Sequence, residues 1–346
     1  MASEAGLQVD YRPLAIQDPA RWERVLGIAA FHIERSSVLA TGNIPVADIR
    51  TPVLGSAGEL CEIWRTRQPV ESGQRARVQY RRGEDVLFGC ISVPESDFQA
   101  PEASGGVSAL QTATEQAYRE IFATVDALAC PHLLRIWNYL PQINLDTHGT
   151  ERYRQFNNAR RNAIAASGRE LTGAVPAACA LGSAPGSPLV IYFLASRATP
   201  AVVENPRQVS AYQYPPQYGP RPVFSRASVL REKSAATLFI SGTASIVGHE
   251  TLHVGDVVAQ TRETLANIEA LLAEANRVCA AVRFEMQALA YKVYVRHSAD
   301  LPLIQAQLHA ALGARARLLY LQADICRQDL LVEIEAIGQD TADSAA

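Results

Sequence analysis

The sequence lacks the short glycine motifs that hold nucleotides or nucleophiles in several large enzyme families. GxGxxG and GxxxxGK[ST] are absent, so neither of the standard phosphate-binding loops is present. GxSxG is also absent, which excludes the usual nucleophile turn of α/β-hydrolases. Nucleotide binding by a standard loop is therefore not indicated.

Basic charge and long apolar runs are also lacking. The net charge at pH 7 is −3, which does not favour a nucleic-acid or membrane-surface function. No run reaches the ~18 apolar residues of a membrane span, and residues 1–14 do not resemble a signal peptide. The six cysteines form no CxxC pair, so we predict reduced thiols in a cytoplasmic protein.

The chain is long enough for two domains and has an ordinary globular composition. It contains 346 residues, of which 48% are hydrophobic and 19% are charged. Its second half alternates strand-like and helix-like segments. These segments are 237–246 (strand, around a glycine turn), 261–279 (helix, with Thr261 as N-cap), 288–296 (strand), 301–312 (helix), 317–322 and 330–337 (strands).

The first half has the same order of elements. Its segments are 86–93 (strand), 112–128 (helix), 133–139 (strand), 151–166 (helix), 174–181 and 189–195 (strands). We interpret this as an internal duplication, although any chain that alternates helices and strands would look similar. The predicted fold class is α/β (α+β), with two tandem β-α-β-α-β-β units and helices on one face of each sheet.

The turn-rich segment 182–188 is predicted to join the two units. We accordingly expect an N-terminal domain over residues 1–185 and a C-terminal catalytic domain over residues 186–346. A second irregular segment, 205–221, holds four prolines and three tyrosines and cannot be a regular helix. Its aromatic content favours an ordered loop that lines a site.

Residues 249–253 match the zinc-protease pattern HExxH. In zinc proteases both histidines lie on one helix, which holds them on the metal. Here Gly248 precedes the pattern, Gly255 follows it, and strand-like sequence leads into it. We interpret the segment as a polar loop, with a zinc hydrolase using His249 and His253 as the less favoured alternative.

Three polar residues stand out from their surroundings. Arg160 lies on the apolar stripe of the 151–166 helix, where it either holds a ligand carboxylate, extends its charged end to water, or pairs with a structural acid. Glu333 and Glu335 share one face of the last strand, because side chains alternate along a strand. That face is either exposed to water, or buries a carboxyl whose pKa is raised enough to donate a proton near pH 7.

Five segments carry a resemblance to known proteins. The segment 331–338, LVEIEAIG, resembles the C-terminal signature of RidA/YjgF proteins. The combination of 151–160, 204–215, 224–227 and 241–249 resembles the chorismatase family over most of the chain from about Leu87 onward. The resemblance is strongest to 3-hydroxybenzoate-forming members, such as the xanthomonad pigment-pathway enzyme that makes both 3- and 4-hydroxybenzoate. It implies tandem RidA/YjgF-like (chorismate-mutase-like) domains.

The resemblance also implies the chemistry. A chorismatase cleaves the enolpyruvyl ether of chorismate, and the resemblance assigns the general acid to Glu333. Capture of the resulting cation by water gives pyruvate and a dihydrodiol acid, whereas capture by the ring hydroxyl leads to 3-hydroxybenzoate. Cys326 matches the cysteine of the benzoate-forming type and is expected to steer the product. Ala244 fits the dihydrodiol type better than glycine would, so the two residues point to different products.

Further residues are expected to bind the substrate on the strength of this resemblance. They are Arg160, Arg226 and Arg317 for the carboxylates, Tyr153 and Tyr212 for the ring, and Gly242 and Ala244 in the turn that approaches the ring. No metal or organic cofactor is implied, and chorismate is the expected partner. The chain is expected to be a monomer or a trimer. The alternative function, from a different class of protein, is that of a RidA-like imine deaminase or a small-ligand-binding protein.

Overall fold

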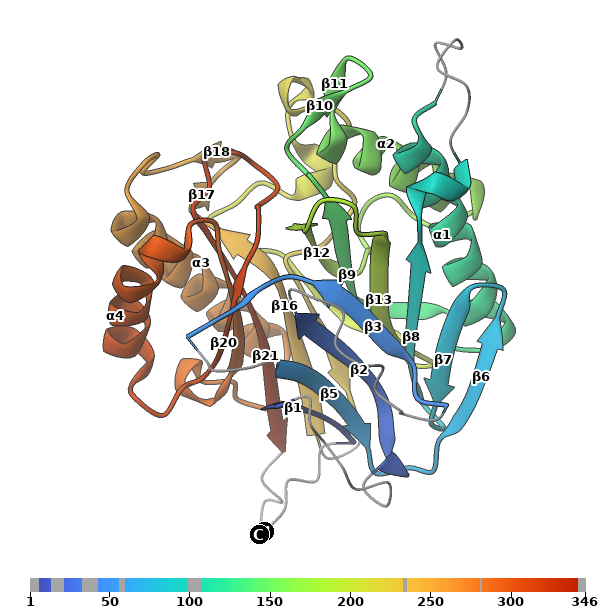
Figure 1. The fold of residues 1–346 in the computed structure, drawn as a ribbon. Coiled ribbons are helices and arrows are strands. Elements are labelled where there is room, and N and C mark those ends of the chain that lie inside the picture. Colours follow the sequence, from blue (N-terminus) through green and yellow to red (C-terminus); the bar gives the residue numbers. More distant parts are fainter. Residues whose placement is uncertain are drawn as a thin grey trace, which may run out of the picture.

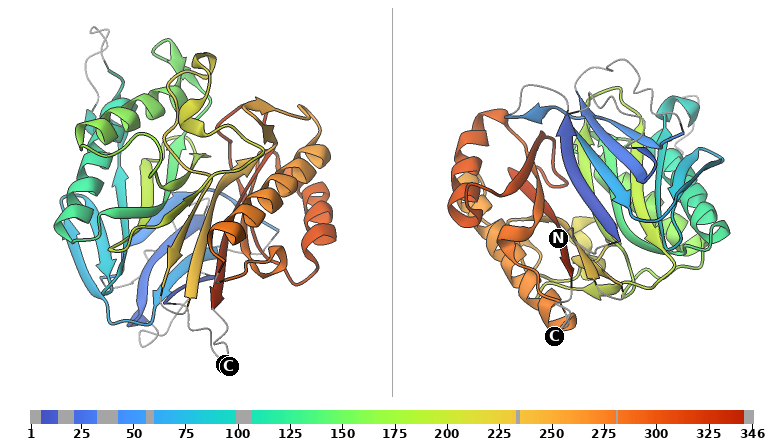
Figure 2. Two further views of the ribbon diagram at one scale, coloured as in Figure 1. Left: turned by 180° about the vertical axis from the view of Figure 1, so that it is seen from behind. Right: turned by 90° about the horizontal axis from the view of Figure 1, so that it is seen from below.

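Three β-sheets lie between two outer pairs of helices (Figure 1). The computed structural model describes residues 6–13, 22–32, 43–55, 60–98, 107–232, 235–280 and 282–341. Helices α1 (Ala109–Ala127) and α2 (Arg152–Ala166) lie on one outer side, and α3 (Val257–Val278) and α4 (Leu301–Leu312) lie on the other (Figure 2). The strands between them form the core that positions the site.

The first large sheet has six strands in the order β12-β9-β13-β8-β7-β6. The strands are β6 (Glu71–Arg75), β7 (Val78–Arg82), β8 (Val86–Val93), β9 (His132–Pro141), β12 (Ala177–Ser183) and β13 (Leu189–Ser196). Only β12 and β9 run parallel, as expected where α2 crosses over between them. The small hairpin of β10 (Asp146–Thr147) and β11 (Thr150–Glu151) leads into α2.

The second large sheet repeats this topology. Its order is β14-β15-β16-β21-β19-β20-β4, and β19 and β20 are its parallel pair. The strands are β4 (Val53–Leu54), β14 (Ala201–Val203), β15 (Ala227–Arg231), β16 (Ala235–Ala244), β19 (Ala290–Val295), β20 (Arg317–Gln322) and β21 (Val332–Thr341). Strands β6, β7, β8, β13, β9 and β12 correspond in order to β14, β15, β16, β21, β19 and β20. The predicted fold class and the internal duplication are therefore confirmed.

The junction between the two repeats differs from the predicted position. The boundary expected between residues 185 and 186 falls between β12 and β13. Strand β13 pairs with both β8 and β9 of the first sheet, so it belongs to the first repeat. The sheet topology therefore divides the repeats between Ser196 and Ala201, because a strand belongs to the sheet whose backbone groups it pairs with.

A four-stranded N-terminal sheet was not predicted from the sequence. Its strands are β1 (Leu7–Pro13), β2 (Val25–His32), β3 (Val46–Arg50) and β5 (Leu60–Thr66), in the order β1-β5-β2-β3. Phe31 and Trp64 of this sheet share one buried cluster with Trp137 of the first repeat and Phe239 of the second. The N-terminal sheet therefore helps to close the core between the two repeats.

Helix α3 begins earlier than the sequence pattern predicted. Its N-cap is Asp256, whose side chain accepts a hydrogen bond from the backbone N–H of Ala259 at 3.0 Å. Thr261, the predicted cap, lies inside the helix and donates to the carbonyl of Val257 at 2.7 Å. Aspartate is a better N-cap than threonine, and its negative charge also interacts favourably with the N-terminal end of the helix dipole. The helix therefore begins after Asp256 and not after Thr261.

Among the described residues, no helix has the length and hydropathy that a membrane crossing requires.

Candidate active site

A cavity of about 310 Å³ lies where the first repeat meets the second. It is lined by residues within 151–154, 208–226, 242–246 and 326–333. These segments are the start of α2, the long loop before β15, the end of β16, and the loop that enters β21. Both repeats therefore contribute side chains to one site.

Glu333 is the buried carboxylic acid of this cavity. It is the second residue of β21, its strand partners are Ala244 and Tyr294, and only 4% of it is exposed. Burial raises its pKa to about 8, and the negative charge of nearby Glu335 acts in the same direction. The carboxyl is thus mostly protonated at pH 7.

Glu335 shares the face of Glu333, but its charge state is the opposite. Burial alone would raise its pKa, but the cations Lys292 and Arg135 outweigh that effect and hold the pKa below its ordinary value. Lys292 Nζ lies 2.9 Å from Glu335, and Arg135 donates to it at 2.6 Å. Two carboxyls on one strand are therefore held in different protonation states, which is typical of acid–base sites.

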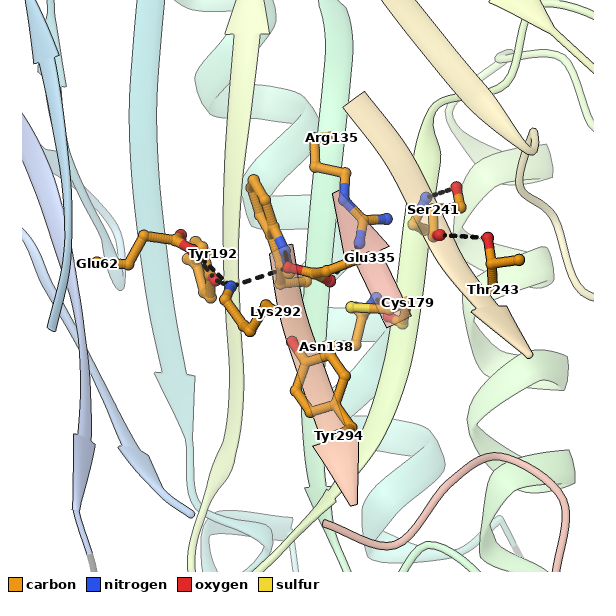
Figure 3. A network of polar contacts seen from close by, with 12 residues as sticks. Glu62, Arg135, Asn138, Cys179, Tyr192, Ser241, Thr243, Lys292, Tyr294 and Glu335 are labelled. Carbon is orange, nitrogen blue, oxygen red and sulfur yellow. Dashed lines mark hydrogen bonds and ion pairs between the residues drawn. The ribbon is translucent and has the colours of Figure 1, made fainter. Parts of the chain in front are cut away.

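Lys292 also connects this carboxylate to the N-terminal sheet. Figure 3 shows Lys292 between Glu335 and Glu62, with Arg135 on the other side of Glu335. Lys292 Nζ lies 2.6 Å from Glu62, and both side chains are fully buried. We call Glu62, Lys292, Glu335 and Arg135 the buried charge network. Its two cations keep Glu335 ionised, on the same face of β21 as Glu333.

Gly242 leaves the space in which the carboxyl of Glu333 lies. A Cβ atom at position 242 would stand 2.0 Å from Glu333 Oε1 and 3.1 Å from the Cβ of Cys179. The predicted glycine turn is instead part of continuous strand β16, which shifts register between Ile240 and Thr243. The site requires glycine at position 242 because it has no side chain, and not because the backbone turns there.

We expect Gly242→Ala to displace the carboxyl of Glu333. Because a misplacement of about 1 Å at a reacting group costs on the order of 10²-fold in rate, kcat should fall by about that factor. Steady-state kinetics, with circular dichroism as a check of folding, measures this. Gly338→Ala on the next strand, where a Cβ would meet Leu289 and Phe284, is the matched control for packing strain. A wild-type kcat in Gly242→Ala would mean that the carboxyl of Glu333 does not need the space beside position 242.

Arg226 and Arg327 supply two cations with free hydrogen-bonding capacity. Arg226 is 4% exposed and donates to the carbonyl of Val209 and to the Tyr214 hydroxyl, at 2.7 and 2.8 Å. Arg327 donates to the carbonyl of His249 at 2.9 Å and lies over the Tyr218 ring at 4.4 Å. In the described part of the chain, the buried Nε of Arg226 and Nη2 of Arg327 have no partner. Both groups can therefore bind an anion.

Cys326 faces the acid as a neutral thiol. Its Sγ lies 3.9 Å from Glu333 Oε2, as a weak sulfur hydrogen bond. Burial raises the pKa of the thiol to about 12, and the neighbouring Glu333 adds to the shift. A thiol with such a pKa is not a nucleophile near neutral pH. Cys326 can shape the cavity or contact a ligand, but it is not set up for covalent catalysis.

Six of the nine predicted site residues line this cavity together. They are Glu333, Cys326, Tyr153, Arg226, Gly242 and Ala244. The placement of the other three is different. Arg317 is exposed, donates to the carbonyl of Ala288, and pairs in register with Ala290 at the other end of the sheet from Glu333. Its position at the start of β20 keeps it from the cavity.

Tyr212 and Arg160 lie on the helix side of the first sheet. Tyr212 is half-buried against the hydrophobic cluster under α1 and α2, while the neighbouring Tyr214 and Tyr218 of the same loop line the cavity. Arg160 is buried, but it lies two helical turns beyond Tyr153 and lines a separate cavity. We therefore do not place Arg160, Tyr212 or Arg317 in the candidate active site.

Sequence reasoning missed Arg327, Tyr214 and Tyr218. A signal for all three was present, because Arg327 follows Cys326 directly and both tyrosines lie in the loop predicted to line a site. The sequence could not show which two of the three tyrosines line the cavity, because the loop contains only single turns of 3₁₀-helix at Ala211–Gln213 and Pro216–Tyr218. Irregular backbone has no fixed side-chain period.

The HExxH segment is not helical, as predicted, but it is not wholly a loop either. Its Glu250–Thr251 form the short strand β18, which pairs with β17 (Ile246–Val247), and His253 has a φ of 58°. His253 Nε2 lies 3.4 Å from Glu263, and His249 Nδ1 lies 3.4 Å from the Tyr218 hydroxyl. Within the described residues, no group of three or more His, Cys, Asp or Glu side chains is placed to hold a metal ion.

Comparison with known proteins gives consistent results. The family described as "Chorismatase FkbO/Hyg5-like, N-terminal" matches residues 62–195. A chorismatase of Streptomyces rapamycinicus is 38% identical over 324 residues, which are 91% of this chain and 92% of the relative. A 3-hydroxybenzoate synthase of Streptomyces hygroscopicus is 36% identical over 295 residues, 82% of this chain and 83% of the relative. A chorismatase crystal structure has a TM-score of 0.86 at 31% identity and covers 98% of this chain, with 99% of its own chain covered.

Proposed function

Since the chain belongs to the chorismatase family, we propose that it cleaves the enolpyruvyl ether of chorismate and releases pyruvate and 3-hydroxybenzoate. The observation that carries the proposal is a neutral, buried carboxyl, Glu333, in a cavity that also holds two incompletely paired guanidinium groups. Chorismate is a dianion with an acid-labile enol ether. One proton donor and two fixed cations are therefore the groups that its cleavage requires.

Glu333 is proposed as the general acid. It donates its proton to the methylene carbon of the enolpyruvyl group, which leaves a cation on the ether carbon and a carboxylate on Glu333. Arg226 and Arg327 are proposed to bind the two substrate carboxylates, with Tyr153 and Tyr214 against the ring. The carboxylate of Glu333 then takes up the proton that the capturing hydroxyl or water releases when its oxygen bonds to the cation, which restores the neutral acid.

The product depends on which oxygen captures the cation. Capture by the ring hydroxyl adds no water, and aromatisation then gives pyruvate and 3-hydroxybenzoate. Capture by water takes up one water molecule and gives pyruvate and trans-3,4-dihydroxycyclohexa-1,5-diene carboxylate. The likeness to a protein named 3-hydroxybenzoate synthase and the presence of Cys326 support the first route. Ala244 on the cavity wall is the observation that favours the second.

Pyruvate release from chorismate tests the proposed function directly. Purified protein is incubated with chorismate, pyruvate is followed by coupled lactate dehydrogenase, and the second product is identified by chromatography. We expect pyruvate together with 3-hydroxybenzoate, and 4-hydroxybenzoate is the second aromatic product to look for. Absence of pyruvate rules out both routes, and a non-aromatic acid in place of the benzoate selects hydrolysis.

We expect the activity to fall as the pH rises through about 8. Glu333 must be protonated to act, and deprotonation above its pKa removes the proton donor. A plot of kcat/KM should therefore be level below that pKa and drop about tenfold per pH unit above it. In Glu335→Gln the anion that raises the pKa of Glu333 is gone, so the fall should begin at lower pH. A profile that instead rises through this range assigns Glu333 as a base.

Cys326→Ala should change the product more than the rate. Removing the neutral thiol leaves the acid in place, so pyruvate release should persist, while the space opened beside Glu333 admits water. We expect the product ratio to shift from 3-hydroxybenzoate toward the dihydrodiol acid, measured by chromatography at equal pyruvate. Cys179→Ala, which removes a second buried thiol next to Gly242, is the control for simple loosening of the core. An unchanged ratio means that Cys326 only fills space.

A further inference from the structure

We infer that the first repeat contains a second ligand site, built around Arg160, that binds an aromatic monocarboxylate of the benzoate class. The cavity lies on the helix side of the first sheet, under α1 and α2, and has a volume of about 160 Å³. None of its lining residues lines the candidate active site. It is therefore a separate cavity. The family resemblance implied that Arg160 binds a substrate carboxylate, but the proposed reaction takes place in the other cavity and gives this one no role.

Among the residues that the structure describes, Arg160 contacts the neutral Tyr118 but forms no ion pair with an acidic side chain. Only 3% of it is exposed, and in the part of the chain that the structure describes its buried Nε and Nη2 have no hydrogen-bond partner. Its guanidinium lies 5.3 Å from the centre of the Tyr118 ring, and burial raises the pKa of that phenol to about 12, so Tyr118 supplies no negative charge. Buried arginines are otherwise found paired, because an uncompensated buried charge is costly. An anion is the missing partner.

The other charged groups at the cavity do not compete for this role. Arg169 at the rim forms an ion pair with Asp126 and lies over the Phe122 ring at 4.4 Å, so its charge is already compensated. Glu170 is exposed, and no ion pair between it and Arg160 is formed. One guanidinium without an anionic partner among the described residues therefore faces this cavity, and it suits one carboxylate.

The size and lining of the cavity identify the rest of the ligand. Tyr118, Phe122, Ile136 and Ile164 form apolar walls. A cavity of about 150 Å³ with such walls accepts one benzene ring. The active-site cavity is about twice as large and holds two incompletely paired arginines, which suits a dianion. A ligand with one aromatic ring and one carboxylate therefore fits the smaller cavity. The aromatic product of the proposed reaction is such a molecule, and this connection rests on the proposed function.

Two segments of the chain contribute residues to both cavities. Pro222 and Phe224 line the active site, whereas Val223 between them lines the cavity of Arg160. Helix α2 is shared in the same way, with Tyr153 and Arg154 on one cavity and Arg160 and Ile164 on the other. Benzoate, rather than chorismate, is the probe that distinguishes them, because it lacks the second carboxylate.

Calorimetric titration of benzoate into the whole protein tests the site. Arg160→Met removes the guanidinium and with it the charge-assisted hydrogen bonds to the carboxylate. We therefore expect the affinity for benzoate to fall by roughly 10- to 100-fold. Arg161→Met, which removes the next arginine of the same helix outside the cavity, should bind benzoate as the wild type does. Arg327→Met, which removes a cation of the active site, should also keep this binding. Val202→Phe fills the cavity from its rim without touching the charge, and should abolish the binding.

Three results overturn the inference. They are the absence of benzoate binding by the wild type, unchanged affinity in Arg160→Met, and binding that is lost in Arg327→Met but kept in Arg160→Met. The last result would mean that benzoate enters only the active site. Pyruvate release from chorismate is measured on the wild type separately, so failure of the proposed reaction and failure of this site give different results.

Discussion

Glu333→Gln is expected to lower kcat for pyruvate release by about 10²- to 10⁴-fold, the usual contribution of general acid catalysis. Glutamine keeps the shape and the hydrogen-bonding atoms of the side chain, but it has no proton of suitable pKa to give. Because Glu333 is buried as a neutral acid, the substitution removes no charge at pH 7. The fold and substrate binding should therefore be retained, and the loss should appear in kcat rather than in KM.

The cavity itself offers the control for this substitution. Glu151 also lines it, is half-buried, and has a pKa raised by burial, partly offset by a hydrogen bond from Asn144. Glu151→Gln should leave kcat within a few-fold of the wild type, because Glu151 already has a donor partner and is more exposed than Glu333. If Glu151→Gln abolishes turnover while Glu333→Gln does not, Glu151 is the acid. Coupled lactate dehydrogenase and chromatography distinguish the two results.

The sequence predicted the repeats because their pattern is local. Strand alternation and helical spacing depend on neighbours within a few residues, and both copies of the β-α-β-α-β-β order followed from them. The shared face of Glu333 and Glu335 was predictable for the same reason, since alternation along a strand needs no knowledge of the rest of the fold. Whether that face meets water or the core was left open, and the packing of the three sheets decides it.

The buried charge network and the N-terminal sheet could not be predicted in this way. Glu62 lies in β5, in the sequence LCEIWRT, where charged residues next to apolar ones are also typical of a strand half-exposed to water. Its burial depends on Lys292, which comes from β19 in the other half of the chain. A contact between residues so far apart leaves no local period, and one sequence alone gives no other sign of it.

Arg160 illustrates the same limit within one helix. Its place on the apolar stripe left open whether the guanidinium is buried or extends to water, and the structure buries it because the stripe of α2 faces the sheet. The cavity that it faces depends on where along the sheet the helix lies, and that is set by β9 and β12 on either side of it in the chain. The sequence therefore showed that Arg160 is unusual, but it could not show that the side chain lines a cavity other than that of Glu333.

Lys292→Met is expected to lower the free energy of unfolding by about 3–5 kcal/mol, the usual cost of removing one partner from a buried ion pair. The lysine lies between Glu62 and Glu335, all three are at most 2% exposed, and methionine fills similar space without charge. Arg135 remains beside Glu335, but Glu62 keeps only neutral donors, from Trp64 and Tyr192. A buried carboxylate without its cation must either unfold the core or take up a proton.

Urea denaturation measures this loss, and two further variants separate charge from packing. Arg277→Met removes a cation from an exposed ion pair with Glu274 and should leave the midpoint almost unchanged. Combining Lys292→Met with Glu62→Gln removes the carboxylate that has lost its cation, leaves Glu335 paired with Arg135, and should recover much of the lost stability. If the double variant is as unstable as Lys292→Met, the loss comes from packing of the lysine chain. If Lys292→Met is as stable as the wild type, the buried pair of Lys292 with Glu62 does not stabilise the fold.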